Sequence, residues 1–236
     1  MRLQACLNGA RPATQGVHIP RTATELADAA RGAVMAGAES LHVHPYQDGI
    51  ETLAPTPVAD CLNAIRDAVP GTPVGISTGA WITPASLALH ADIAAWGVTP
   101  DFVSINLSED DAPDIMQIAS AKGIGIEAGL WSVADVDRFL GLSVPQVLRV
   151  LIEVPDLDAD TALDLYRTMV LKLDGRTPVL AHGEDRSAWP IAMAALQDGH
   201  ATRIGFEDTI LLPNGDPARD NAALVHAAAQ ILGTTG

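Results

Sequence analysis

The sequence predicts a (β/α)8 barrel, or TIM barrel, that forms a single domain over residues 1–236. Eight short β-rich segments alternate with Ala- and Leu-rich amphipathic segments, at the spacing expected of repeated strand-helix units, and no low-complexity linker interrupts them. The turn after the first expected strand, Leu7-Asn8-Gly9-Ala10, lacks the glycine-rich phosphate turn of a doubly wound sheet. Together these observations favour the closed barrel.

Each expected strand is a short apolar run, and each expected helix is a longer run with apolar residues at helical spacing. In chain order, the strands are expected at residues 3–7, 40–44, 73–77, 101–105, 123–127, 147–152, 177–181 and 202–206. The helices are expected at residues 24–36, 57–69, 84–96, 112–121, 133–140, 160–173, 189–197 and 218–232. Thr22 or Thr24 with Glu25, Thr83 before Pro84, and Ser187 stand where helix caps and first-turn prolines are found.

The composition excludes several functional classes. The chain has a formal net charge of −15 with its acidic residues spread out, so its surface repels nucleic acids and anionic membranes. No apolar run is long enough to span a bilayer, and the segment after Arg2 lacks the apolar core of a signal peptide, so we expect a cytoplasmic protein. Cys6 and Cys61 lack metal-binding spacing and are expected to be buried free thiols.

Polar and ionisable residues collect where the expected strands end. In a barrel of this type the active site lies at the carboxyl ends of the strands. The residues at those ends are Asn8, His42, His44, Ser77, Thr78, Gly79, Asn106, Glu127, Glu153, His182, Glu184, Glu207 and Asp208. The sequence therefore predicts a functional site at one rim of the barrel.

His42 and His44 form the most informative motif. Successive side chains of a strand point to opposite faces, so the two imidazoles point together while Val43 points away. Barrel closure brings the last strand beside the first, where Glu207 could complete a coordination shell. Two imidazoles and a carboxylate leave an open position, which is typical of a catalytic divalent metal, with zinc preferred over cobalt, manganese or iron. The alternatives are hydrogen-bonded core histidines and a Glu207 that caps a loop or pairs with an arginine.

Two further groups at this rim suit chemistry on a carboxylic acid. Arg203 and Asp208 could form an oriented base near the metal, or only an ion pair at a strand end. Ser77, Thr78 and Gly79 offer hydroxyl and main-chain N–H donors for a substrate carboxylate, although a plain strand-to-helix turn fits the same residues.

Three ionisable residues at the rim have more open roles. Glu127 needs a partner such as a bound ammonium, a hydroxyl or an arginine, and Arg149 is the structural alternative. His182 and Glu184 could contact either substrate or cofactor, so the sequence assigns them no single role.

Over its whole length the chain resembles the β-keto acid cleavage enzymes. The resemblance is carried by Leu7-Asn8-Gly9-Ala10, His42-Val43-His44, Ile76-Ser77-Thr78-Gly79, Ile126-Glu127-Ala128-Gly129 and Arg203-Ile204-Gly205-Phe206-Glu207-Asp208. It implies a TIM barrel, usually a homotetramer, with a divalent metal, usually Zn2+, held by His42, His44 and Glu207. It also implies a β-keto acid and acetyl-CoA as the substrates.

The resemblance implies a mechanism as well. Asp208, oriented by Arg203, would remove a proton from the carbon between the keto and carboxylate groups, which the metal makes more acidic. The enolate would attack acetyl-CoA, and a retro-Claisen step would release acetoacetate and a new acyl-CoA. Ser77, Thr78 and Asn106 would hold the substrate head, and Glu127 would face its variable tail.

The chain departs from the family pattern at two places that bear on its substrates. The namesake enzyme, which cleaves 3-keto-5-aminohexanoate, has a glutamate after the Gly-Ala turn that selects an amino group, whereas this chain has Arg11. We therefore expect Arg11 to bind an anionic or neutral tail rather than a cationic one, unless it is a surface arginine. Glu153-Val154-Pro155-Asp156-Leu157 replaces the family's Gly-Val-Pro-Gly-Gly loop, which lies toward the thioester.

Two other classes of function stay open. A metal-dependent hydrolase of the amidohydrolase type also uses an HxH pair in a barrel, but normally on the first strand and with further histidines on later strands, where this chain has only His182. The second is a binding protein that retains the metal and small-molecule site without turnover.

Overall fold

The structure is a computed structural model that describes residues 2–12, 17–143, 146–175 and 177–234. Eight parallel strands in these ranges close into a barrel, in the order β1-β10-β9-β8-β7-β6-β5-β2. They are β1 (Leu3–Cys6), β2 (Ser40–Val43), β5 (Val74–Ser77), β6 (Phe102–Asn106), β7 (Gly125–Leu130), β8 (Arg149–Val154), β9 (Val179–Gly183) and β10 (Ala201–Ile204). The predicted (β/α)8 architecture is confirmed.

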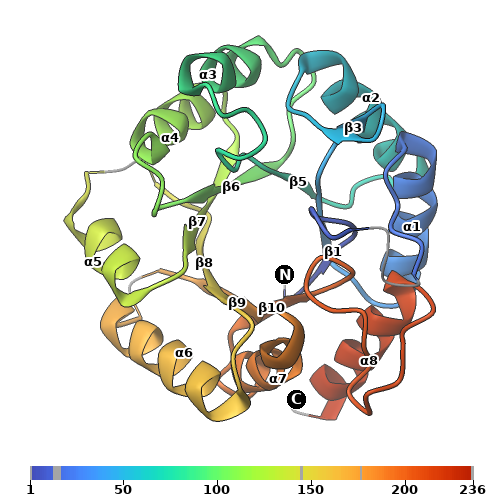
Figure 1. Ribbon diagram of the computed structural model, residues 1–236, viewed down its shortest axis with the longest axis vertical. Coiled ribbons are helices and arrows are strands. Elements are labelled where there is room, and N and C mark those ends of the chain that lie inside the picture. Colours follow the sequence, from blue (N-terminus) through green and yellow to red (C-terminus); the bar gives the residue numbers. More distant parts are fainter. Residues whose placement is uncertain (1, 13–16, 144–145, 176, 235–236) are drawn as a thin grey trace.

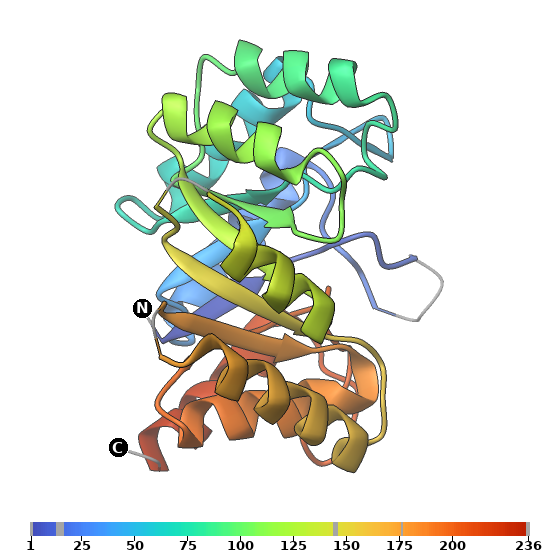
Figure 2. The same cartoon turned by 90° about the vertical axis from the view of Figure 1, so that its left-hand side faces the viewer.

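Helices surround the barrel, and Figure 1 shows them as an outer ring around the strands. Within the described ranges they are α1 (Ala23–Met35), α2 (Pro55–Ala68), α3 (Ser86–Ala95), α4 (Ala112–Ala121), α5 (Val133–Gly141), α6 (Ala159–Leu173), α7 (Ala188–Gln197) and α8 (Asn221–Thr234), with a short 3-10 turn, η2 (Asp185–Ser187), before α7. None of these helices has the length and apolar content needed to cross a bilayer. In Figure 2 the helices flank the tilted strands along the length of the molecule.

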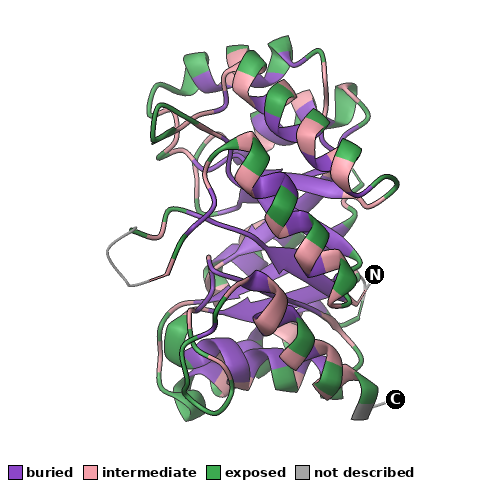
Figure 3. Ribbon diagram, turned by 90° about the vertical axis from the view of Figure 1, so that its right-hand side faces the viewer, coloured by how far each residue is buried: buried purple, intermediate pink, exposed green. Residues whose placement is uncertain are grey.

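The core lies between the barrel strands and the inner faces of the helices. The strands are buried along nearly their whole length, whereas the helices alternate buried and exposed faces (Figure 3). Burial on both faces explains why the strands read as continuous apolar runs. At the start of α1, Thr22 and Glu25 form the predicted capping box, and the helix buries Leu26 and Ala30. The cap expected at Thr83 and Pro84 is wrong, because α3 begins only at Ser86.

Three strands on the side of the barrel opposite β2 run two or three residues further than their sequences suggest. β7, β8 and β9 extend to Leu130, Val154 and Gly183, beyond the ends expected for them. The error is largest in β7, where the expected end at Glu127 lies three residues short of Leu130. Glu127 is therefore a mid-strand residue, in register with Arg149 of β8.

A small hairpin after β2 is the element that the sequence did not predict. It consists of β3 (Tyr46–Gln47) and β4 (Ile50–Glu51), which pair in an antiparallel manner. The hairpin lies between β2 and α2, so it extends the chain directly after His44. Its last residue, Glu51, contacts His44, one of the predicted metal ligands.

Candidate active site

His42, His44 and Glu207 are brought together at the carboxyl rim of the barrel. The Nε2 atoms of His42 and His44 are 3.2 Å apart, and Glu207 Oε2 lies 3.3 Å from His44 Nε2 and 3.8 Å from His42 Nε2. Ligands of a tetrahedral zinc ion, each about 2.0–2.2 Å from the metal, lie about 3.3–3.6 Å from one another. The three donor atoms therefore fit a single divalent ion.

The charges around these atoms favour a cation. Burial lowers the pKa of His42 well below its ordinary value, which keeps this imidazole neutral. Burial also disfavours protonation of His44, but the carboxylates of Glu207 and Glu51 outweigh it and raise the His44 pKa to about 10. Burial opposes the charge of Glu207, but Arg203 and His44 hold its pKa well below the usual range. A positive charge is thus favoured between Glu207 and His44, and either a proton or a metal ion would supply it.

Glu51 contacts one of the two candidate metal ligands, His44, on the side away from Glu207. Its Oε1 atom contacts Nδ1 of His44, and its Oε2 atom accepts a hydrogen bond of 3.1 Å from Nε1 of Trp81. A carboxylate on the far nitrogen of a metal-binding histidine fixes the ring orientation and leaves the other nitrogen for the metal. Glu51 was missed by the sequence reasoning because it belongs to the unpredicted hairpin.

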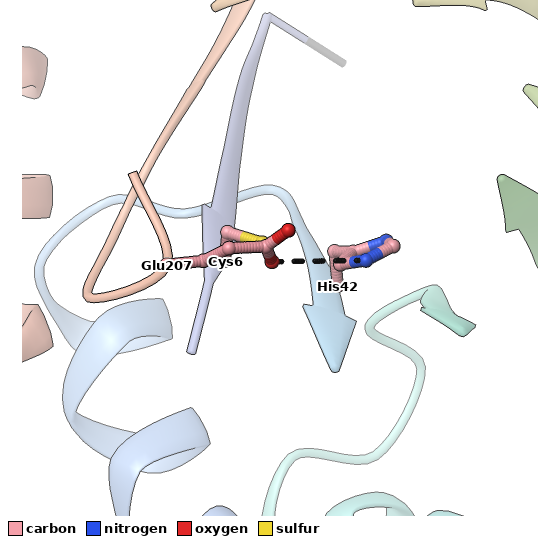
Figure 4. Close-up of side chains that lie close together, drawn as sticks. All are labelled: Cys6, His42 and Glu207. Carbon is pink, nitrogen blue, oxygen red and sulfur yellow. Dashed lines mark hydrogen bonds and ion pairs between the residues drawn. The ribbon is translucent and has the colours of Figure 1, made fainter. Parts of the chain in front are cut away.

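Cys6 lies beside the candidate metal ligands, which its sequence context does not suggest. It is a buried free thiol, as predicted, but its Sγ atom contacts Glu207 Oε2. Figure 4 shows Glu207 beside Cys6 and facing His42, and these three side chains place one donor atom each within 4.8 Å of one another. The spacing of the cysteines gave no sign of this neighbourhood, in which the Cys6 thiol could act as a further donor beside His42 and Glu207.

Two glycines allow Glu207 to reach this position. Gly205 passes against strand β1, where an added Cβ would lie only 1.9 Å from the Cys6 carbonyl oxygen. Gly9 has a φ of +65°, and a Cβ there would lie 2.3 Å from Cγ of Glu207. The Asn8-Gly9 turn thus provides the space that the Glu207 side chain occupies.

Asp208 and Arg203 form the predicted pair, within a larger buried cluster. Arg203 donates from Nε to Asp208 Oδ1 at 3.1 Å and from Nη2 to Glu207 Oε1 at 2.9 Å. His182 bridges two carboxylates, with Nδ1 3.0 Å from Asp208 Oδ1 and Nε2 3.3 Å from Glu153 Oε2. Burial and Arg203 disfavour a charged His182, but Asp208 and Glu153 raise its pKa to about 9. The Oδ2 atom of Asp208 is buried and has no hydrogen-bond partner among the described residues.

A cavity of about 380 Å³ opens over this rim. Its lining combines metal donors, hydroxyls, carboxylates and two indoles: Ala10, Arg11, Pro12, His42, His44, Ser77, Trp81, Ser104, Asn106, Trp131, Glu153, Glu184, Asp185, Arg203 and Glu207. Trp81, Ser104 and Trp131 were not singled out from the sequence. Two of them follow β5 and β7 in loops, where no motif marks them, and Ser104 lies inside an apolar strand.

Four predicted site residues do not line this cavity. Thr78 is buried, and its hydroxyl donates to the Ser104 carbonyl oxygen at 2.7 Å. Gly79 is covered by the ring of Trp81, and Asp208 lies behind Arg203 with no exposed surface. Glu127 is buried in mid-strand, where it accepts hydrogen bonds from Gln4 Nε2 at 3.0 Å and Arg149 Nε at 2.8 Å. The contacts of Glu127 match its structural alternative, and a role in binding the substrate tail stays a prediction.

Arg11 lines the cavity but is held by the chain itself. Its Nε atom donates to the Phe206 carbonyl oxygen at 2.9 Å, and Nη2 donates to the carbonyl oxygens of Glu207 and Asp208 at 3.1 Å each. Nη2 also lies 2.9 Å from Asp185 Oδ1. In this structure Arg11 fastens the segment that carries Glu207, and contact with a substrate stays a prediction.

The sequence model of the beta-keto acid cleavage enzyme family matches this chain over residues 1–236. The chain belongs to this family. It is 22% identical over 234 residues to a 3-keto-5-aminohexanoate cleavage enzyme of Acetoanaerobium sticklandii, covering 91% of this chain and 84% of that protein. A protein of the same name from Fusobacterium nucleatum is 25% identical over 236 residues, covering 92% and 85%. The predicted family is thus confirmed.

Solved structures support the fold of this family member. The ternary complex of ObcA with a C4-CoA adduct and oxalate superposes with a TM-score of 0.65 at 14% identity, covering 92% of this chain and 64% of ObcA. The chain therefore spans less than two thirds of ObcA. A type I 3-dehydroquinate dehydratase from Clostridium difficile superposes with a TM-score of 0.67 at 11% identity, covering 100% and 93%. At these identities the likeness concerns the barrel alone.

Proposed function

We propose that this family member is a metal-dependent enzyme that condenses a β-keto acid with acetyl-CoA and releases acetoacetate and a new acyl-CoA. The observation that carries the proposal is the convergence of His42, His44 and Glu207 on one point in a cavity that Arg203 also lines. The names of the relatives and the CoA adduct held by ObcA support keto acid and CoA chemistry.

The metal and its ligands follow from the donor set. His42, His44 and Glu207 would hold a divalent ion, and two imidazoles, a carboxylate and a nearby thiol favour Zn2+. When bound, the ion supplies Lewis acidity to the keto group of the substrate, which makes the adjacent carbon more acidic. Glu51 keeps the Nε2 atom of His44 turned toward this ion.

The chain's own residues position the substrate and move its proton. Ser77 at the end of β5 and Ser104 within β6 would donate hydrogen bonds to the substrate carboxylate, and Asn106 at the end of β6 lines the same cavity. Oδ2 of Asp208 would accept the proton of the carbon between the keto and carboxylate groups, after a shift of the Arg203 side chain, behind which Asp208 is buried here, opens it to the cavity. Arg203, which binds both Asp208 and Glu207, would keep that base in place.

In the remaining steps one carbon–carbon bond forms, another breaks, and CoA passes from the acetyl group to the acyl group of the substrate. The deprotonated carbon attacks the acetyl carbonyl of acetyl-CoA, which forms one carbon–carbon bond and expels the CoA thiolate. The thiolate then attacks the original keto carbon, and the bond between that carbon and the deprotonated one breaks. The electron pair of that bond takes up the proton, so the products are acetoacetate and a new acyl-CoA.

Assembly and location complete the proposal. The enzyme would form a homotetramer, as the family resemblance implies. The two free cysteines, both buried and unpaired, fit a reducing compartment such as the cytoplasm.

Metal analysis of the purified protein and a screen of β-keto acids with acetyl-CoA test the proposed function. We expect about one divalent ion per chain and acetoacetate release that requires acetyl-CoA. Hydrolysis without CoA would instead indicate the amidohydrolase-type reaction. Bound metal without turnover of any β-keto acid would indicate a binding protein, and either result would contradict the proposal.

A further inference from the structure

Two carboxylates at the ends of β8 and β9 face the cavity and have no part in the proposed reaction. Glu153 is 6% exposed, and only its Oε2 atom has a partner, His182. Its Oε1 atom is buried without a hydrogen-bond partner among the described residues. The carboxylate of Glu184 makes neither a hydrogen bond nor an ion pair within the described part of the chain, and burial raises its pKa. Glu153 is buried and Glu184 is half-buried. Carboxylates withdrawn from water without a partner are costly, so both are suited to a positively charged ligand.

The strand order places these carboxylates across the barrel from the metal donors. β8 is the fourth strand from β2 in either direction around the closed ring. Glu153 on β8 is therefore opposite His42 on β2, and Glu184 follows the neighbouring strand β9. A substrate whose keto acid end lies at His42 and His44 would extend its tail across the cavity toward Glu153 and Glu184.

One indole borders such a tail. Trp131 follows β7, which neighbours β8, and it lines the cavity. Its N–H group donates to Asn106 Oδ1 at 3.1 Å, which holds the ring in place. An aromatic face attracts a cationic nitrogen. Trp81 also lines the cavity but lies on the side of the metal donors, because it follows β5 and donates to Glu51 at 3.1 Å.

The cations of the cavity are shared among several carboxylates, and Arg203 and His182 act on Glu184 only through space. Arg11 pairs with Asp185, and Arg203 pairs with Glu207 and Asp208. His182 is shared between Asp208 and one oxygen of Glu153. The carboxylate of Glu184 therefore remains for a ligand and Glu153 lines the cavity beside it, in a protein whose net charge of −15 already favours cations.

We propose that Glu153 and Glu184 form the subsite for the substrate tail, and that this tail carries a cationic nitrogen. The inference rests on the proposed function and names the class of β-keto acid that the enzyme takes. It reverses the expectation drawn from Arg11, because the guanidinium of Arg11 is engaged with main-chain carbonyl oxygens and Asp185.

The subsite is tested with three β-keto acids of equal length. Their tails end in an ammonium, a hydroxyl or a carboxylate group. We expect kcat/KM for acetoacetate release to be at least about tenfold higher for the ammonium acid than for the hydroxyl acid, and lowest for the carboxylate acid. Glu184→Gln should lower the ammonium-to-hydroxyl ratio about tenfold. Because both substrates are measured on one preparation, the ratio does not depend on the folded fraction.

Asp156→Asn is the matched control. It makes the same change from carboxylate to amide in the neighbouring loop, at a side chain that is 46% exposed and paired with Arg186 outside the cavity. This variant should keep the wild-type ratio. If wild type shows no preference for the ammonium acid, or if Glu184→Gln keeps that preference, the subsite is overturned while the proposed reaction stands.

If the wild type cleaves none of the three acids, the proposed reaction fails and the subsite is tested by binding alone. Calorimetric titration of the ammonium and hydroxyl acids, without acetyl-CoA, then supplies the ratio of Kd values. A preference for the ammonium acid that Glu184→Gln weakens about tenfold supports the subsite. Equal ratios in the two proteins overturn it.

Discussion

At the scale of single residues, the site depends on close contacts between segments far apart in the chain. Cys6 and Glu207 touch although 201 positions separate them, and Gly9 leaves the space that Glu207 fills. The sequence identified His42, His44 and Glu207 because residue type and strand alternation mark them. It could not identify Cys6 as a neighbour of the metal candidate, since a lone cysteine in an apolar strand looks the same wherever it packs.

Replacement of Gly9 by alanine tests the packing of Glu207. We expect Gly9→Ala to lower metal affinity at least tenfold, because its Cβ would displace the Glu207 side chain. Gly123→Ala is the control, since Gly123 also has a positive φ, +70°, but has no atom within 4 Å of the added Cβ. Both variants should lose about 1 kcal/mol of stability from the backbone conformation. If the Gly9→Ala variant and the control variant bind metal equally well in a chelator competition assay, the proposed packing of Glu207 is contradicted.

The pH dependence of stability tests the charge on His182. Its pKa is about 9 in the folded protein against an ordinary value of 6.5, so protonation stabilises the fold fully below pH 6.5 and this contribution is lost as the pH rises through 9. The stability of wild type relative to His182→Gln should therefore decrease, on the order of 2–3 kcal/mol, between pH 6 and pH 9.5. Urea unfolding of the two metal-free proteins measures this difference in the free energy of unfolding.

His226→Gln makes the same substitution at an exposed position of α8 and serves as the control for this series. Its stability difference from wild type should stay nearly constant over the same pH range. A constant difference for His182→Gln as well would show that folding does not raise the pKa of His182.

At the scale of elements, the sequence predicted every barrel strand but not where each ladder ends. Apolar runs show that a segment is buried, whereas the number of paired residues depends on the neighbouring strands. This difference explains Glu127, which was expected at the rim and instead lies in mid-strand against Arg149. The β3–β4 hairpin was not predicted because its two-residue strands are too short to show alternation.

The hairpin contributes Glu51, and removal of the Glu51 carboxylate tests whether the hairpin supports metal binding. Glu51→Gln should weaken metal binding about 10–100-fold, because the orientation of the His44 ring loses its carboxylate partner. Asp67→Asn, at an exposed position of α2, should bind metal like wild type. Metal titration against a competing chelator distinguishes the two variants. A Glu51→Gln protein with wild-type affinity would mean that the hairpin does not support the metal site.

At the scale of the whole molecule, closure of the barrel creates the site. β1 pairs with both β2 and β10, so the first, second and last strands of the barrel bring Cys6, His42 and Glu207 to one place. The opposite strands, β8 and β9, supply Glu153 and Glu184. The same closed ring thus provides a side with the candidate metal ligands and an acidic side, and residues of both sides line the cavity.

The fate of the acetyl group is the most direct test of the central claim, that this rim carries out metal-dependent cleavage of β-keto acids by acetyl-CoA. Acetyl-CoA labelled with ¹³C in its acetyl group is incubated with a β-keto acid and the metal-loaded enzyme, and the products are followed by NMR. The account predicts that the label appears in the keto and methyl carbons of acetoacetate, and that chelation of the metal abolishes this transfer. Label found only in unreacted acetyl-CoA or in free acetate would contradict it.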